Sequence, residues 1–276
     1  MNFRRIQIIF LITFIAIDIF LFGMFQQNLN MQAENVSKGN TDSTIVKEMK
    51  DDQIDLGKLS TSTGSGFYLA GSPSDTLRNQ IGQLINQTPH YVGHQLMSEL
   101  KQPINVDKNN PAKTINNLLS DPTFILNGSQ YVYNKTLSSP QMIVYTQKAM
   151  GKQILSAEGQ IRFNLNTSHQ ILSYTQTYLD GIKNLREKAA TISEQRALIW
   201  LYQYNEIPNN SKVEWIQQGY TKLLSVDSDQ VLIPTWVIAI KPQNSTQIQI
   251  KRINAFNGGI IKDSNQNIQS NYSAVG

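Results

Sequence analysis

The longest apolar stretch of the chain lies at its N-terminus, over residues 6–25 (IQIIFLITFIAIDIFLFGMF). Only Gln7, Thr13 and Asp18 interrupt it as strongly polar residues. A helix rises about 1.5 Å per residue, so a stretch of this length spans roughly the 30 Å hydrocarbon core of a bilayer. The pattern therefore predicts one transmembrane helix over residues 6–25, preceded by a short N-terminus of residues 1–5.

The charges around this segment predict its orientation. Arg4 and Arg5 precede it, and the next basic residue is Lys38. The positive-inside rule then places residues 1–5 in the cytoplasm and the rest of the chain outside the cell membrane. A cleaved signal peptide is the alternative, but the apolar run is longer than the usual 7–15 residues and no A-x-A cleavage site follows it. The sequence favours an uncleaved anchor.

Asp18 lies well inside the predicted membrane helix. A carboxylate at the bilayer centre costs about 3 kcal/mol on insertion scales, so it rarely faces lipid alone. Because no second membrane helix is predicted, we expect the group that contacts Asp18 to come from another chain or from a second copy of this one. The alternative is that an otherwise apolar helix tolerates one acid. The expected partner contact in the membrane comprises Asp18, Thr13, Phe14 and Phe22.

The remainder of the chain shows short helical and strand patterns. Residues 26–42 are polar and unpatterned, which is typical of a linker. After them, helical patterns alternate with runs of short strands, which predicts an α+β extracellular domain with mainly antiparallel sheets and packed helices. The order of helix then strands occurs twice, which favours two similar halves, residues 43–180 and residues 181–276.

Three local patterns predict particular elements. The alternation of apolar and polar residues over 160–166 indicates a half-buried strand that forms a hairpin with the segment after it. Thr191 and Glu194 have the spacing of a capping box and predict the start of a helix. Pro234 suggests that its strand begins late or lies at the edge of a sheet.

Composition narrows the range of functions. Charged residues make up only 16% of the chain, and the net charge is +4. No basic residues cluster into the stripe that nucleic-acid binding proteins show. The chain has no cysteine, which excludes disulfide bonds, thiolate catalysis and Cys-ligated zinc.

A search for catalytic motifs finds none that is complete. His90 and His94 are four residues apart, but the glutamate of the zinc-protease motif is missing between them. Ser98 and Lys101 match S-x-x-K, yet no K-T-G motif accompanies them. The two aspartates of residues 226–230 are typical of a hairpin turn. We therefore predict no catalytic residue, no metal and no cofactor, and a protein that is not an enzyme.

Three segments resemble the YycI (WalI) family, regulatory proteins of low-GC Gram-positive bacteria. In the N-terminal helix the resemblance includes the basic pair Arg4 and Arg5, the position of Asp18 after a Thr-Phe pair, and a Phe-rich end. Residues 192–220 (ISEQRALIWLYQYNEIPNNSKVEWIQQGY) resemble the late helix, the Ile-Pro turn and the following strand of the family. The segments PTWVIAIKP and IKRINAFNGGII are similar to the end of that family and of PepSY-type modules.

The resemblance implies a regulatory function. YycI proteins act with a sister protein, YycH, and with the sensor histidine kinase WalK (YycG). They adjust the WalK–WalR (YycG/YycF) two-component system, which controls cell-wall metabolism. The resemblance further implies that the membrane helix contacts the kinase's membrane helices, and that the two halves of the extracellular domain are PepSY-like or YycH-like.

Two other classes of function remain open on the sequence. One is an extracellular protein that binds the cell wall, since Trp200, Trp215 and Trp236 could line a sugar-binding surface as well as a core. The other is a PepSY-like inhibitor of a secreted peptidase. A homo-oligomer is also compatible with the acid in the membrane helix.

Overall fold

The computed structural model describes residues 3–33, 39–73 and 75–262. The chain forms two compact units, residues 1–49 and residues 50–276. The first unit contains helix α1 (Phe3–Ala33) and most of helix α2 (Gly39–Asp51). Within the described residues, one helical stretch, Gln7–Met24, is long and apolar enough to cross a membrane.

Helix α1 extends beyond the predicted membrane span. It continues from Phe25 to Ala33, and α2 begins at Gly39. Helical backbone therefore occupies much of the segment expected as a linker, while residues 34–38 lie outside the described residues. Gln, Leu, Met and Ala, which make up most of residues 26–33, have good helix propensity, whereas Asn28 and Asn30 do not.

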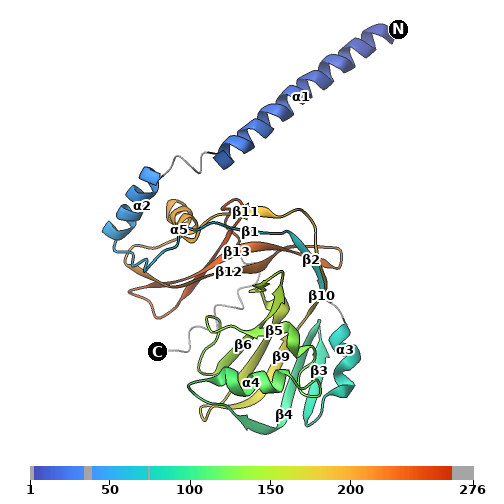
Figure 1. Ribbon diagram of the computed structural model, residues 1–276, viewed down its shortest axis with the longest axis vertical. Helices are drawn as coiled ribbons and strands as arrows, with labels where there is room; N and C mark the ends of the chain where they lie inside the picture. The colour runs from blue at the N-terminus through green and yellow to red at the C-terminus, as the bar shows by residue number, and fades with distance from the viewer. Residues whose placement is uncertain (1–2, 34–38, 74, 263–276) are drawn as a thin grey trace. The chain divides into compact units, whose positions relative to one another are not determined.

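The second unit is built from three antiparallel sheets, shown in Figure 1. A seven-stranded sheet has the order β3-β4-β9-β8-β6-β5, with β7 paired to β6, and a five-stranded sheet has the order β10-β2-β13-β12, with β14 paired to β13. Strands β1 and β11 form a third, two-stranded sheet. The prediction of an α+β fold with mainly antiparallel sheets is confirmed. The strands are β1 (Gly64–Gly66), β2 (Leu69–Pro73), β3 (Gln87–Val92), β4 (Gln95–Asn105), β5 (Tyr131–Tyr133), β6 (Met142–Ala149), β7 (Lys152–Gln153), β8 (Gln160–Leu165), β9 (Gln170–Thr177), β10 (Leu179–Asn184), β11 (Ala189–Thr191), β12 (Ser211–Val226), β13 (Asp229–Pro242) and β14 (Gln249–Asn254).

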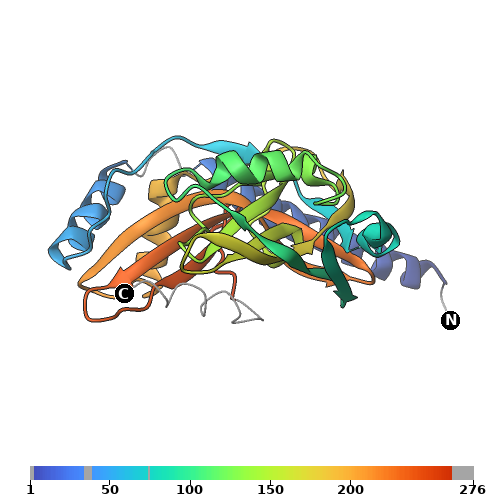
Figure 2. The same ribbon diagram turned by 90° about the horizontal axis from the view of Figure 1, so that it is seen from below.

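Three helices complete this unit: α3 (Thr76–Gln80), α4 (Pro111–Leu119) and α5 (Glu194–Gln203). Helix α4 lies over one face of the seven-stranded sheet, as Figure 2 shows in green. Its buried Ile115 and Leu119 belong to a core that includes the aromatic rings of Tyr145, Phe163 and Tyr174. The predicted hairpin after residue 160 is confirmed, since β8 and β9 pair antiparallel.

The five-stranded sheet takes strands from distant parts of the sequence. Strands β2 and β10 pair with each other, and β2 also pairs with β13. One sheet thus contains strands from before and after residue 181. The division of the domain into halves 43–180 and 181–276 stays a prediction.

Pro234 occupies a central strand, so the prediction of an edge or a late start is wrong. Strand β13 begins at Asp229 and pairs with β12 along its length. On its other edge it pairs with β2 over residues 230–232 and with β14 over residues 235–240. Pro234 falls in the gap between these two partners, where the missing N–H removes no hydrogen bond from the ladder.

Helix α5 begins at Glu194, two residues later than a capping box on Thr191 predicts, and it has a different cap. The hydroxyl of Ser193 accepts a hydrogen bond from the backbone N–H of Arg196 at 3.2 Å, and Thr191 lies in β11 instead. The capping-box assignment to Thr191 is therefore wrong. The helix buries Ala197, Leu198, Ile199 and Leu201.

Polar side chains join the two large sheets. The amide Nδ2 of Asn134 donates to Oε1 of Gln153, and Nε2 of Gln217 donates to the same oxygen at 3.0 Å. Beside them the N–H of Leu155 donates to the carbonyl of Tyr220 at 2.7 Å. The junction is therefore fixed by directional hydrogen bonds as well as by apolar packing.

Gly258 is the glycine with the least room for a side chain. Its φ is +70°, and a Cβ atom there would lie 1.6 Å from Cε3 of Trp200. We predict that Gly258→Ala destabilises the protein by more than about 2 kcal/mol, because the half-buried indole of Trp200 must move as well as the backbone. Gly57→Ala is the matched control, since φ is +62° there and a Cβ would meet nothing within 4 Å. Its expected cost is about 1 kcal/mol, from backbone strain alone. Denaturant unfolding of both variants checks this, and equal losses would contradict the role of Trp200.

Burial raises the pKa of the phenols of Tyr131, Tyr145 and Tyr174. Tyrosines of the unfolded chain ionise near about pH 10, so the stabilisation from keeping these phenols neutral is present below that pH and is lost as the pH rises above it. We predict a loss of unfolding free energy between about pH 9 and about pH 11 that is less steep in Tyr174→Phe. Urea unfolding across this range checks the slope. The exposed Tyr204 provides the control: Tyr204→Phe should leave the slope unchanged, and a similar change in both variants would contradict the assignment.

Candidate functional site

The predicted membrane contact lies on helix α1. At about 100° per residue, Phe14 and Phe22 each lie about 40° from Asp18 around the helix axis, so the three side chains share one face. All three are exposed within the described part of the chain. We call Phe14, Asp18 and Phe22 the Asp18 face.

Thr13 lies elsewhere on the helix. It is about 140° from Asp18 around the axis, and its hydroxyl donates to the carbonyl of Ile9 at 2.9 Å. The helix thus satisfies this hydroxyl internally, and Thr13 is not part of the Asp18 face. Its expected contact with a partner stays a prediction, and a partner that contacts Thr13 would have to approach a different side of the helix.

Gln7 lies on the same side of the helix as the Asp18 face, although the sequence prediction of the partner contact does not include it. It precedes Asp18 by eleven residues, which is three helical turns to within about 20°. Gln7 and Asp18, two of the three strongly polar residues of the predicted membrane segment, therefore lie on one stripe of the helix. Their spacing of eleven residues is the pattern that predicts this. Arg4 and Arg5 are the residues that predict the orientation of the helix in the membrane. Their backbone lies in α1, while their side chains lie outside what the structure describes.

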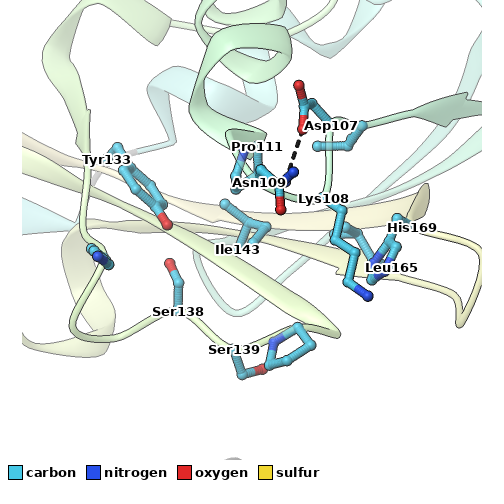
Figure 3. Close-up of a pocket in the computed structure, with 13 residues that line it drawn as sticks. Asp107, Lys108, Asn109, Pro111, Tyr133, Ser138, Ser139, Ile143, Leu165 and His169 are labelled. Atoms are coloured by element: carbon cyan, nitrogen blue, oxygen red, sulfur yellow. Dashed lines mark hydrogen bonds between the residues drawn. The ribbon is translucent and has the colours of Figure 1, made fainter.

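A second candidate site is a cavity of about 330 Å³ in the second unit, shown in Figure 3. It lies where the end of β4, the start of α4, the loop between β5 and β6, and the β8–β9 turn meet. Figure 3 shows Ile143 with Tyr133 and Ser138 on one side and Lys108 and His169 on the other. The lining residues are Val106, Asp107, Lys108, Asn109, Pro111, Tyr133, Lys135, Ser138, Ser139, Pro140, Ile143, Leu165 and His169.

Two polar groups of this cavity have structural tasks. One carboxylate oxygen of Asp107, Oδ1, accepts hydrogen bonds from the backbone N–H groups of Asn109 and Asn110, at 2.8 and 3.2 Å. The hydroxyl of Ser138 donates to the carbonyl of Asn134 and accepts from the N–H of Val144. These bonds shape the two loops that form the walls.

His169 is held at the cavity by the β8–β9 turn. Its backbone has φ +55°, and its carbonyl accepts from the N–H of Val106 at 2.9 Å. The side chain is half-buried. The turn between β8 and β9 thus places the imidazole of His169 in the lining of the cavity.

The remaining sequence motifs do not form sites. His90 lies on strand β3 and His94 in the turn after it, where Nδ1 of His94 lies 3.4 Å from a carboxylate oxygen of Asp75. Ser98 is buried and donates to Oε1 of Gln87, whereas Lys101 is exposed. Residues three apart on a strand point to opposite faces, so these two cannot act together. Within residues 3–33, 39–73 and 75–262, no three His, Asp or Glu residues are placed to hold a metal ion.

Comparison with known proteins decides the family. The model of the YycI protein family matches residues 32–256, which is most of the chain. The chain belongs to the YycI family. The match begins after the apolar stretch of α1 and ends at Phe256, whose ring stacks on that of Tyr68 with centroids 4.7 Å apart.

Two solved structures are similar to this YycI-family chain. One is an uncharacterised protein from Eubacterium rectale, with 11% identity, 76% of this chain and 89% of that chain covered, and a TM-score of 0.45. The other is the C-terminal domain of YpeB from Bacillus megaterium, with 11% identity, 81% and 95% covered, and a TM-score of 0.37. No curated protein matches the chain.

Membership of the YycI family supports one general role. The protein is an accessory regulator associated with a two-component system. The apolar helix near the N-terminus is compatible with a single-pass membrane anchor. Membership of a regulatory family also favours a non-catalytic protein.

Proposed function

We propose that this YycI-family protein is a membrane-anchored accessory regulator that, together with a YycH-type partner, modulates the WalK sensor histidine kinase. Its N-terminus lies in the cytoplasm, and the domain that follows the anchor lies outside the cell. The observation that carries the proposal is the family match over residues 32–256. Through the kinase, the protein adjusts a two-component system that controls cell-wall metabolism.

The proposed contact in the membrane is the Asp18 face of α1. The aromatic rings of Phe14 and Phe22 flank the carboxyl group on the same side of the helix, which allows packing against a neighbouring helix around a polar centre. A carboxylate in hydrocarbon costs about 3 kcal/mol, and a hydrogen bond from a helix of the kinase would recover part of this cost. Regulation requires that this contact differ in free energy between the two signalling states of the kinase.

We predict that Asp18→Leu preserves membrane insertion and alters kinase output. Leucine removes the polar group and makes the span more apolar, so insertion becomes easier while the polar contact is lost. A reporter gene under control of the two-component system, read together with the amount of protein in the membrane, is the measurement. Phe20→Leu is the control, because Phe20 lies about 160° from Asp18 around the helix axis and so lies off the Asp18 face. An unchanged reporter at a normal protein level would refute the role of Asp18.

A crosslink in the membrane tests the partner directly. A photoreactive residue replaces Phe14 or Phe22 on the Asp18 face, or Phe20, which lies about 160° from Asp18. We expect capture of a histidine kinase or a YycH-like protein from positions 14 and 22, and much weaker capture from position 20. Mass spectrometry identifies the captured chain. If positions 14 and 22 capture only lipid or copies of this protein, the helix is an anchor and the proposed contact is wrong.

A further inference from the structure

The cavity beside α4 combines an apolar floor with a rim of hydrogen-bond donors. Val106, Ile143 and Leu165 are buried and form the apolar part. Pro111 and Pro140 add apolar surface without N–H groups. A volume of about 330 Å³ lies within the range of small-molecule sites, which are mostly apolar with a few polar groups that orient the ligand.

The rim of the cavity carries an excess of positive charge. Lys108 and Lys135 each contribute an ammonium group, and His169 contributes an imidazole that adds positive charge when protonated. Within the described part of the chain, no hydrogen bond or ion pair engages these three side chains. Asp107 is the only acid among the lining residues, and one of its oxygens already accepts two backbone N–H groups.

The remaining polar groups of the rim also favour a ligand rich in acceptors. Tyr133 and Ser139 present hydroxyl groups at the cavity, and hydroxyls can donate to an anion. Lysine ammonium groups donate only, whereas the two hydroxyls can donate or accept, so these four side chains can offer more donors than acceptors. Hydrogen bonds from charged donors to an anion are stronger than those between neutral groups.

We propose that this cavity binds a small organic anion, in which a carboxylate or a phosphate group is attached to an apolar body. The anionic group lies between Lys108, Lys135 and His169, and the apolar body lies on Ile143 and Leu165. The proposal does not rest on the proposed function, because it follows from the cavity alone and its test measures binding and not kinase output.

A set of related probes tests the charged group and the apolar body of the ligand separately. N-acetyl-leucine carries a carboxylate and an apolar body, N-acetyl-leucinamide lacks the charge, and N-acetyl-glycine lacks the apolar body. Hexyl phosphate replaces the carboxylate by a phosphate ester. Binding to the full-length protein in detergent micelles is measured by titration with isotope-labelled protein. For a ligand of this size we expect a Kd on the order of 1 mM for N-acetyl-leucine, with at least tenfold weaker binding of the amide and of N-acetyl-glycine.

Paired variants test the location. Lys108→Gln combined with Lys135→Gln removes two charges from exposed side chains, so folding should be retained, and binding of N-acetyl-leucine should fall at least tenfold. The control combines Lys58→Gln with Lys183→Gln, two exposed lysines outside the cavity, and changes the net charge equally. It should bind as the unaltered protein does.

Each outcome decides the proposal. The proposal is supported if the carboxylate or the phosphate probe binds more strongly than the amide, and if this binding is lost in the cavity variant and kept in the control. The anion that binds more tightly shows whether the ligand carries a carboxylate or a phosphate. Equal binding of acid and amide, equal loss in both double variants, or no binding of either anion overturns it.

Discussion

The pairing of β12 with β13 is the constraint on which the second unit depends. The two strands pair from Ser211 with Pro242 to Val226 with Asp229, and β13 then offers its other edge to β2 and β14 in succession. The same hairpin supplies Tyr220, whose carbonyl accepts from Leu155 beside the seven-stranded sheet. Strands separated by more than a hundred residues thus reach one sheet, because the long hairpin pairs directly with β2 and β14, and β2 in turn pairs with β10.

The cavity depends on the seven-stranded sheet in a similar way. Backbone hydrogen bonds hold the loops in its walls: the N–H of Val106 donates to the carbonyl of His169, and the N–H of Asn134 donates to the carbonyl of Val144 in β6. The aromatic core of Tyr145 and Phe163 lies in the same cluster as Ile143, which forms the floor. Loops supported by a rigid sheet can hold polar groups in fixed positions, which is the usual arrangement of binding sites.

Local patterns predicted several elements but not β3 and β4, and not the partners of the strands. The 20-residue apolar run and the alternation over 160–166 predict α1 and the β8–β9 hairpin, because each depends on neighbours in sequence. The prediction from Pro234 is wrong because β13 pairs with β2 before this residue and with β14 after it. The gap between the two partners is visible only in the tertiary structure. The cap of α5 is Ser193 because β11 takes Thr191 into a sheet. The cavity brings Lys108 and His169 together across 61 positions, and no local pattern reports such a meeting. The Asp18 face, in contrast, could be worked out from helical geometry alone.

The length of α1 has a mechanical consequence. With 31 residues it is about 46 Å long at 1.5 Å per residue, whereas the hydrocarbon core is about 30 Å thick. In the proposed single-pass arrangement, one continuous helix runs through the bilayer and well past it, as far as Ala33. A continuous helix is stiff and transmits a rotation about its own axis along its length. A turn of the Asp18 face about the helix axis is reproduced at Ala33, whereas a flexible linker beginning at residue 26 would have dissipated it.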